Sequence, residues 1–285
     1  MVNYNNLGLS EVLMYNTVKL ICKDKRGEGY YGTGFIFKYF RTEKDSVPVI
    51  VSNKHILEDT TDIMLTLHRS NNDNIPIPET RSVITIHLEP DLKYFLHHPD
   101  KNIDLSIFPF GKLIEYELYD GRRPYYSGFD QTTIPTEEEW QNLHVFEDVL
   151  SIGYPLGMMD EMNNFPIFIK GHTATHPNIN YNFTETFLIN SNNYSGSSGS
   201  PIILLNNNFY EKSRNRDGLY SGVKLLGILY SGFEIKFNGE IIENSIENIY
   251  NFDNKISLPT QICKILRSTK LNDFEDDLKK HSDKI

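Results

Sequence analysis

Short runs of β-branched and aromatic residues recur along most of the chain, and turn-forming residues separate them. The first series comprises TVKLIC, GTGFIFKYF, VPVIVSN, DIMLTLH and SVITIHL. A second series starts near residue 148 and comprises DVLSIGY, FPIFIKGHT, TFLINS, PIILLNN and LLGILYSG. Runs of this length and spacing are typical of strands in all-β sandwiches and barrels. At 285 residues, the chain is long enough for two such units.

Two helices are predicted, one between the two series and one at the end. In PTEEEWQNL, Thr136 can cap a short helix whose first turn carries glutamates. From about Leu258, the opening pair Pro259 and Thr260 and an apolar stripe favour a C-terminal helix. The stripe consists of Ile262, Ile265 and Leu266. We therefore expect an N-terminal unit over residues 1–115, a linker over 116–147, a second unit over 148–257, and a helix with a tail over 258–285.

The composition disfavours several classes of protein. The formal net charge is −10 at pH 7, which argues against nucleic acid as a partner because binding phosphates needs positive charge. The sequence has no apolar run of about 18 residues, so no membrane partner is expected, and its N-terminus lacks the features of a signal peptide. The two cysteines, Cys22 and Cys263, lie far apart and are expected to be unpaired packing residues in a reducing cytoplasm.

A serine-rich segment, YSGSSGSPII at residues 194–203, separates two predicted strands. A glycine–serine turn between buried strands forms a tight loop rather than a flexible linker. Its core, residues 196–201, has the form G-x-S-G-x-P. The glycines allow successive N–H groups to point into one concavity, where an anion can bind. If Ser198 is a nucleophile, its own N–H and that of Gly196 would form an oxyanion hole.

A serine hydroxyl is a weak nucleophile unless a base accepts its proton. Among the nine histidines, His55 has the most suitable context, directly after the apolar run VIVSN and before another apolar pair. Asp104 in NIDLSIFPF opens an apolar strand, where a carboxylate is costly unless it is hydrogen-bonded. His68 and His87 also lie on predicted strands but lack comparable neighbours. The chain order of the candidates is therefore His55, Asp104 and Ser198.

This order, in these three contexts, resembles that of the trypsin-like serine peptidases, which have the chymotrypsin fold. VSNKHI resembles the TNKHV form of the bacterial glutamyl endopeptidase and exfoliative-toxin branch. IDLSIFPF resembles DLAIVKF, SIGYPLG resembles VTGYPG, and GTGFIF and LLGILYSG resemble the strands before the histidine and after the serine. The resemblance covers roughly residues 18–266. It implies an all-β fold of two antiparallel six-stranded β-barrels with a C-terminal helix, the first barrel carrying His55 and Asp104 and the second carrying Ser198.

The resemblance also implies a role for each candidate. Ser198 would attack the scissile carbonyl, His55 would act as general base and then general acid, and Asp104 would fix the tautomer of His55. The N–H groups of Gly196 and Ser198 would bind the oxyanion. The register of the motif disfavours the other serines of the loop as nucleophiles; these are Ser195, Ser197 and Ser200. An activating start like the IVGG of digestive enzymes is missing from the sequence, so constitutive folding or control by a partner is expected instead.

The sequence says less about the substrate preference than about the catalytic candidates. The positions that form the primary pocket in the family correspond here to Asn192, Asn193, Leu229, Tyr230, Ser231 and Gly232. Glutamyl endopeptidases carry a histidine in GIHWG where this chain has Leu229, and no aspartate stands about six residues before Ser198. Neither a glutamate nor a Lys/Arg preference is therefore supported. The asparagines could bind a polar residue or serve the turn, and His172 could face the cleft or be an ordinary strand residue.

No cofactor and no metal are expected. His97, His98 and Asp100 lie close to Asp104, but a solvated loop is the better interpretation because no second group of ligands follows at a recognisable spacing. The sequence favours a bacterial, cytoplasmic serine endopeptidase that hydrolyses protein or peptide substrates, with narrow specificity or a regulatory protein partner. The alternative is a non-catalytic peptide-binding module on the same fold, and esterase chemistry with the same residues is a third possibility.

Overall fold

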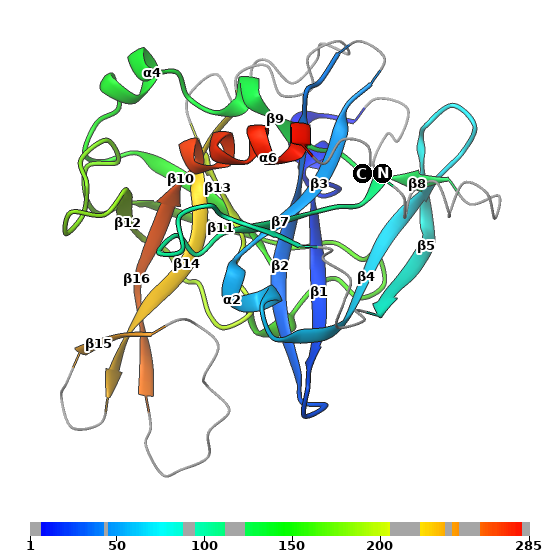
Figure 1. The fold of residues 1–285 in the computed structure, drawn as a ribbon, viewed down its shortest axis with the longest axis horizontal. Coiled ribbons are helices and arrows are strands. Elements are labelled where there is room, and N and C mark those ends of the chain that lie inside the picture. The colour runs from blue at the N-terminus through cyan, green and yellow to red at the C-terminus, as the bar shows by residue number, and fades with distance from the viewer. Residues whose placement is uncertain are drawn as a thin grey trace.

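The computed structural model describes residues 7–42, 45–87, 95–111, 123–205, 223–236, 241–244 and 257–280. Two largely antiparallel sheets form the body of this part of the chain, and short helical segments lie around them (Figure 1). Each run predicted as a strand coincides with a strand of these sheets over most of its described length, and several run one or two residues past its end. The all-β class predicted from the sequence is therefore confirmed.

The first sheet contains the strands of the N-terminal series. Its path is β5 (Pro76–His87), β4 (Thr60–Ser70), β1 (Thr17–Asp24), β2 (Gly29–Tyr39), β3 (Val47–Ser52), β7 (Ser106–Pro109) and β6 (Leu96–His97). Two short strands join it from the side: β8 (Pro124–Tyr125) pairs with β4, and β9 (Phe129–Asp130) pairs with β2 in parallel. The pairings among the described strands form an open path, so they do not show the closed six-stranded barrel that was predicted for this half.

The second sheet closes on itself. Its path is β13 (Pro201–Leu204), β10 (Asp148–Gly153), β11 (Ile167–Thr173), β12 (Thr186–Asn190), β16 (Ser257–Arg267) and β14 (Lys224–Lys236), with β15 (Ile241–Asn244) added at the side of β14. A further pairing joins β13 to β14. These pairings close a six-stranded barrel, as the sequence predicted for the second half.

The predicted C-terminal helix begins later than expected. The segment from Leu258, which was interpreted as a helix, belongs to strand β16, and the helical part is η3 (Ser268–Phe274) followed by α6 (Glu275–Lys280). Strand β16 pairs with β12 on one side and β14 on the other. Of the apolar stripe that suggested a helix, Ile265 and Leu266 are buried and Ile262 is half-buried, and β-branched residues such as the isoleucines pack well in a sheet. Pairing on both sides outweighs the local helical pattern.

Successive side chains of β2 point to opposite faces of the first sheet, and those on one face form part of the core between the two sheets. Phe35 and Phe37 are fully buried in a cluster with Ile152 and Ile203 of the second sheet, whereas Ile36 points to the opposite face and into a separate cluster within the first sheet. Each fully buried phenylalanine stabilises the fold by about 1.5–3 kcal/mol. The C-terminal helical segment joins the same intersheet cluster through residues that include Leu271, Phe274 and Leu278.

The predicted cap of the short helix between the sheets is confirmed. Helix α4 (Glu137–Gln141) begins after Thr136, whose side chain accepts from the Glu139 amide while the Glu139 carboxylate accepts from the Thr136 amide. This reciprocal arrangement satisfies two amides that the first turn leaves without partners. The helix then places Trp140 in the core of the second barrel.

The buried His68 predicts a pH-dependent stability. Its ring stacks on Phe165 and contacts the edge of Tyr15, and Nε2 lies 3.2 Å from the Asn164 carbonyl oxygen. Burial lowers its pKa from 6.5 to about 4. Between these pH values, His68 is therefore protonated in the unfolded chain but not in the folded one. The free energy of unfolding is expected to fall by about 2–3 kcal/mol as the pH drops from about 6.5 to 4.

Urea denaturation at several pH values measures this effect. His68→Gln is expected to lose this part of the pH dependence, whereas His144→Gln, which changes an exposed histidine, is expected to retain it. A His68→Gln protein that loses stability toward pH 4 as steeply as the wild type would contradict the prediction.

Candidate active site

The serine-rich segment forms a tight loop between β12 and β13. The Ser197 amide donates to the Tyr194 carbonyl (2.9 Å), and the Ser200 amide donates to the Ser197 carbonyl (2.9 Å), so two turns follow each other directly. Gly196 and Gly199 have φ of +87° and +90°, a region that other residues rarely adopt. The prediction of a structured loop rather than a linker is confirmed.

His55 and Asp104 come from neighbouring strands of the first sheet. Strand β3 ends at Ser52, helix α2 (Lys54–Leu57) follows with His55 in its first turn, and Ser52 pairs in register with Ser106 of β7. This register brings Asp104, which precedes β7, beside α2. His55 Nδ1 lies 2.5 Å from Asp104 Oδ2, and the His55 amide donates to Asp104 Oδ1 (3.0 Å).

The pairing decides the tautomer of the imidazole. An ionised carboxylate only accepts hydrogen bonds, so the proton lies on Nδ1 of His55 and Nε2 can accept one. The Asn53 side chain also donates to the Asp104 backbone carbonyl (3.0 Å), which holds the start of β7 against α2. This geometry suits a general base, which needs an oriented ring with an accepting nitrogen.

The serine loop docks on the same region of the first sheet. The Thr33 amide of β2 donates to the Ser198 carbonyl (2.8 Å), and the Ser52 hydroxyl donates to the Thr33 carbonyl (2.8 Å). Ser52 lies three residues before His55, so the loop of the second sheet meets the end of the first sheet from which the histidine emerges. Ser198 is 2 % exposed.

The Ser198 hydroxyl is not engaged in this state. Its Oγ is buried and has no hydrogen-bond partner among the residues that the structure describes. A hydrogen bond between a nucleophile and its base is often long before substrate binds and tightens in the complex. The loop therefore presents a hydroxyl that a substrate or a base can engage without displacing an existing bond.

The hydrogen bonds of the preceding carbonyls fix the direction of two amides of the loop, those of Gly196 and Ser198. The Ser195 carbonyl accepts from the Leu156 amide (2.5 Å), and the carbonyl preceding Ser198 accepts from the Ser200 amide. Across a trans peptide the N–H points opposite to the C=O, so the Gly196 N–H points away from Leu156 and the Ser198 N–H points away from Ser200. Within the described residues neither amide donates to a backbone carbonyl. They can serve as donors to an oxyanion.

Gly199 supports a prediction about the loop's stability. A Cβ at this position would lie 1.9 Å from the Thr33 carbonyl oxygen and 2.7 Å from the Ser52 hydroxyl. Gly199→Ala is expected to lower the free energy of unfolding by about 3–5 kcal/mol, because the strain of a positive φ adds to a clash with backbone. Gly27→Ala is the matched control, since Gly27 has φ +82° and no atom within 4 Å of the added Cβ; it should cost about 1 kcal/mol. Similar losses in both variants, measured by urea denaturation, would contradict the clash.

The residues expected to form the specificity pocket divide into two groups. Asn192 is exposed, whereas Asn193, Leu229 and Ser231 are buried. The Asn193 side chain accepts from the Ser151 hydroxyl (3.1 Å), and the Leu229 carbonyl accepts from the Gly199 amide (2.8 Å). Strand β14 thus lies directly against the serine loop, as the resemblance implied, and Gly232 lies further along the same strand. Asn192 does not join this buried group.

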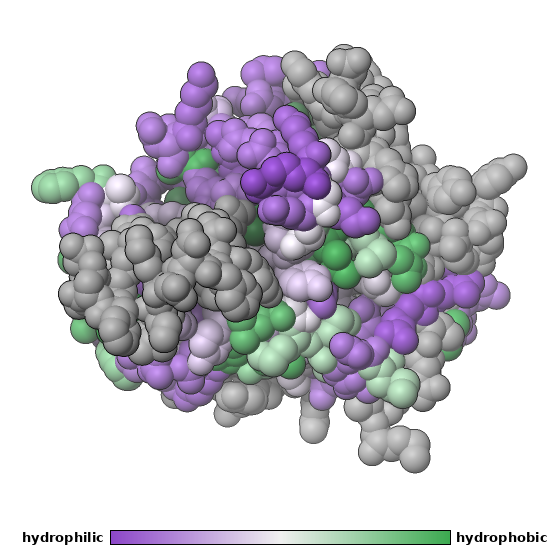
Figure 2. Space-filling model, turned by 90° about the horizontal axis from the view of Figure 1, so that it is seen from below, coloured by the Kyte–Doolittle hydropathy of each residue, from purple (hydrophilic) through white to green (hydrophobic). Residues whose placement is uncertain are grey.

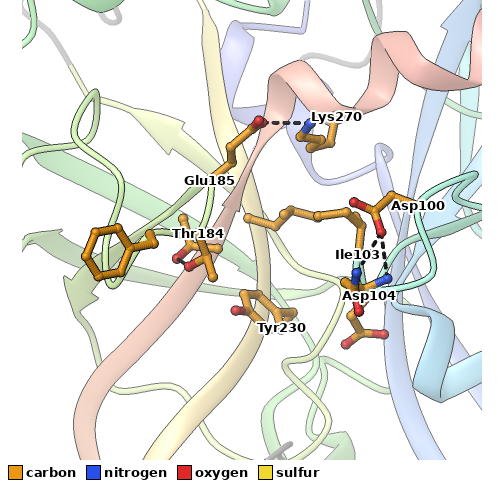
Figure 3. Close-up of a pocket in the computed structure, with 11 residues that line it drawn as sticks. Asp100, Ile103, Asp104, Thr184, Glu185, Tyr230 and Lys270 are labelled. Carbon is orange, nitrogen blue, oxygen red and sulfur yellow. Dashed lines mark hydrogen bonds and ion pairs between the residues drawn. The ribbon is translucent and has the colours of Figure 1, made fainter.

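A cavity of about 250 Å³ opens beside Asp104 (Figure 3). Its walls come from the segment before β7, the start of β12 and strand β14, and they include Tyr230 and Asp100. On one side Glu185 and Lys270 form an ion pair (2.7 Å). Tyr230 therefore lies on the same side of the site as Asp104 rather than in the group around Asn193.

The other candidate groups have structural partners. His98 Nε2 lies 3.0 Å from Asp273 Oδ2, and His97 Nδ1 lies 2.7 Å from the Ser106 hydroxyl. His172 stacks on Phe146 with ring centres 4.6 Å apart. Cys22 and Cys263 are both buried, and neither forms a disulfide within the described residues. In the described ranges no group of three histidine, cysteine or acidic side chains is arranged to hold a metal, and none of the helices in those ranges combines the length and apolarity of a membrane span.

Sequence reasoning missed Thr33. It stands in GTGFIF, which was noted only as a strand, yet its amide, hydroxyl and carbonyl all take part in docking the serine loop. The available signal was a polar residue between two glycines, directly before an apolar run. That pattern alone does not tell a surface turn from a buried contact.

Comparisons with known proteins give only distant structural matches. No protein-family model and no curated protein matches the chain. Among solved structures, an HtrA-type protease, AlgW, with a tripeptide has 10% sequence identity and a TM-score of 0.49; the match covers 98% of this chain and 64% of that chain, so this chain spans less than two thirds of that protein's length. The protease Anisep from Arthrobacter nicotinovorans has 12% identity and a TM-score of 0.48, with 92% and 95% covered.

A protease from M. tuberculosis, in its active form, has 12% identity and a TM-score of 0.42, with 97% of this chain and 85% of that chain covered. At such identities and scores the matches assign no role to any residue. The roles proposed below therefore rest on the geometry of the chain itself.

Proposed function

We propose that the chain is a serine endopeptidase in which Ser198 is the nucleophile, His55 the general base and Asp104 the residue that orients His55. The observation that carries the proposal is the meeting of two independent parts. A histidine–carboxylate pair sits at the end of β3, and the loop with a buried, unbonded Ser198 hydroxyl docks on that same end. A turn with a purely structural role has no need for the oriented imidazole beside it.

The reaction follows from these groups. Ser198 Oγ bonds to the carbonyl carbon of the scissile peptide while its proton passes to Nε2 of His55, and the carbonyl oxygen becomes an oxyanion held by the amides of Gly196 and Ser198. The C–N bond then breaks, and the leaving amine takes the proton from His55. Water attacks the resulting acyl-enzyme with His55 again accepting a proton, and Ser198 is released with the carboxylic acid product.

Proteins or peptides are the proposed substrates. Several large apolar side chains near the loop are exposed, including Leu156, whose amide binds the loop, and Met158 two residues later. Figure 2 shows hydrophobic residues in separate groups on one face, interspersed with hydrophilic ones. The exposed Leu156 and Met158 beside the loop suit contact with an extended peptide chain. Because Leu229 and Asn193 provide no charge, we propose a narrow preference for an uncharged residue, not for glutamate, lysine or arginine.

Labelling with a fluorophosphonate probe tests the proposal. The purified wild-type protein is expected to react with the probe, alone or after addition of source-cell lysate, and peptide mapping should place the phosphonyl group on Ser198. His55→Ala should lower the labelling rate by about 10³-fold or more, since the hydroxyl then lacks its base. An adduct on another serine, or none under either condition, would contradict the proposal.

A non-catalytic peptide-binding module is the second candidate. The observation in its favour is that Ser198 makes no hydrogen bond to a base in this state. Unchanged peptide binding in a protein that never labels, with or without lysate, would support this alternative over the first.

A further inference from the structure

Thr33 holds the serine loop through its amide and its hydroxyl, and its carbonyl anchors it to β3. Its amide donates to the Ser198 carbonyl (2.8 Å), and its hydroxyl donates to the Gly196 carbonyl (2.8 Å). Its own carbonyl accepts from Ser52 (2.8 Å). The side chain is completely buried. Strand β2 of the first sheet thus binds the backbone carbonyls of Gly196 and Ser198, the two residues whose amides are proposed to bind the oxyanion.

The Thr33 hydroxyl also joins the loop to a second support. Besides donating to Gly196, it accepts from the Tyr154 amide (3.1 Å). Tyr154 leads into η2 (Pro155–Gly157), where the Leu156 amide holds the Ser195 carbonyl (2.5 Å). The carbonyls on both sides of the Gly196 amide are therefore held, one by Leu156 and one by Thr33.

We propose that Thr33 is a positioning residue that sets the direction of the Gly196 amide and so pre-forms the oxyanion hole. The inference rests on the proposed function and deepens it. If the hydroxyl is lost, the Gly196 carbonyl and the Tyr154 amide both lose this buried partner, so the 196–197 peptide can rotate and Tyr154 is held less firmly. Tyr154 leads to the Leu156 amide that holds the Ser195 carbonyl. The 195–196 peptide, which carries the Gly196 N–H, is then supported less well on both sides and can turn this donor away from the oxyanion.

Thr33→Val removes the hydroxyl and keeps the shape of the side chain. Its kcat for a peptide substrate, and its rate of fluorophosphonate labelling, are expected to fall about 10- to 100-fold, because one oxyanion donor contributes about 10²–10³-fold and is here misdirected rather than deleted. KM should stay within about threefold, since the contact matters most in the transition state. Thr33→Ser restores the hydroxyl and should recover most of the rate.

Thr173→Val is the matched control. Thr173 is also buried, and its hydroxyl donates to the Val145 carbonyl (2.7 Å) and accepts from the Glu147 amide (2.8 Å), so the same two kinds of bond are lost away from the loop. It should lower the free energy of unfolding by a similar amount while leaving kcat unchanged. If Thr33→Val does not fold, Thr33→Ala relieves any crowding by the second methyl and is compared with Thr173→Ala in the same way.

The outcomes separate this inference from the proposed function. A fall in kcat with Thr33→Val but not with Thr173→Val, together with rescue by Thr33→Ser, supports the role of Thr33. A folded Thr33→Val enzyme as active as the wild type overturns that role and leaves the endopeptidase standing. A wild-type protein that does not react with the probe in lysate overturns the proposed function and this inference with it.

Discussion

Ser198→Ala is expected to abolish peptide hydrolysis and, at the same time, to leave the fold as stable as the wild type or more so. Loss of a serine nucleophile lowers kcat by about 10⁶-fold where the rest of the triad is intact. The Ser198 hydroxyl is buried and unpartnered among the described residues, so replacing it with a methyl group removes an unsatisfied polar atom. The free energy of unfolding should rise by up to about 1 kcal/mol.

Ser200→Ala provides the control within the same loop. Its Oγ is likewise buried and without a hydrogen-bond partner in the described part of the chain, but Ser200 has no place in the proposed chemistry. Both variants are expected to gain stability in urea denaturation, and Ser200→Ala should keep its activity. Residual labelling of Ser198→Ala at the wild-type rate would reject Ser198 as the nucleophile. Strong destabilisation by Ser198→Ala would show that its hydroxyl has a structural partner.

Asp104→Asn is expected to lower kcat by about 10⁴-fold with a small effect on stability. The aspartate accepts two hydrogen bonds from His55, one from the backbone amide and one from Nδ1. Asparagine has one accepting oxygen and one donating nitrogen. If its oxygen keeps the amide contact, its NH₂ group faces Nδ1, and the imidazole must carry its proton on Nε2. That nitrogen can then no longer take the proton of Ser198.

Asp100→Asn is the matched change of charge for this prediction. Asp100 lines the same cavity, and its carboxylate accepts from the Asn102 amide (2.9 Å) and not from the imidazole of His55. Steady-state kinetics should therefore show kcat within about twofold of the wild type, as expected for an exposed charge that solvent and salt screen. Equal losses in the two variants would indicate a general effect of negative charge. A normal rate for Asp104→Asn would reject its role in orienting His55.

Local patterns in the sequence were enough to predict most of the strands and one helix cap. The alternating apolar runs predicted strands that the structure contains, because period-two patterning places one side of each strand in a core. The capping box at Thr136 was also predictable, since it depends on residues three positions apart. The strand that begins near Leu258 was not predictable, because the spacing of its apolar residues suits a helix as well as a strand. Its pairing with β12 and β14, which lie elsewhere in the chain, makes it a strand.

For the candidate site, the sequence by itself singled out the residues that we propose carry the chemistry: a histidine after a strand, an aspartate opening another, and a serine between glycines. Those identities depend on reactivity and local backbone freedom, which short motifs record. Only the tertiary structure decided how they are held. The register of β3 with β7 places Asp104 beside His55, and the docking of one sheet on the other gives Thr33 its contact with Gly196 across 163 positions of sequence. Such contacts depend on the packing of two sheets, and no local pattern encodes that.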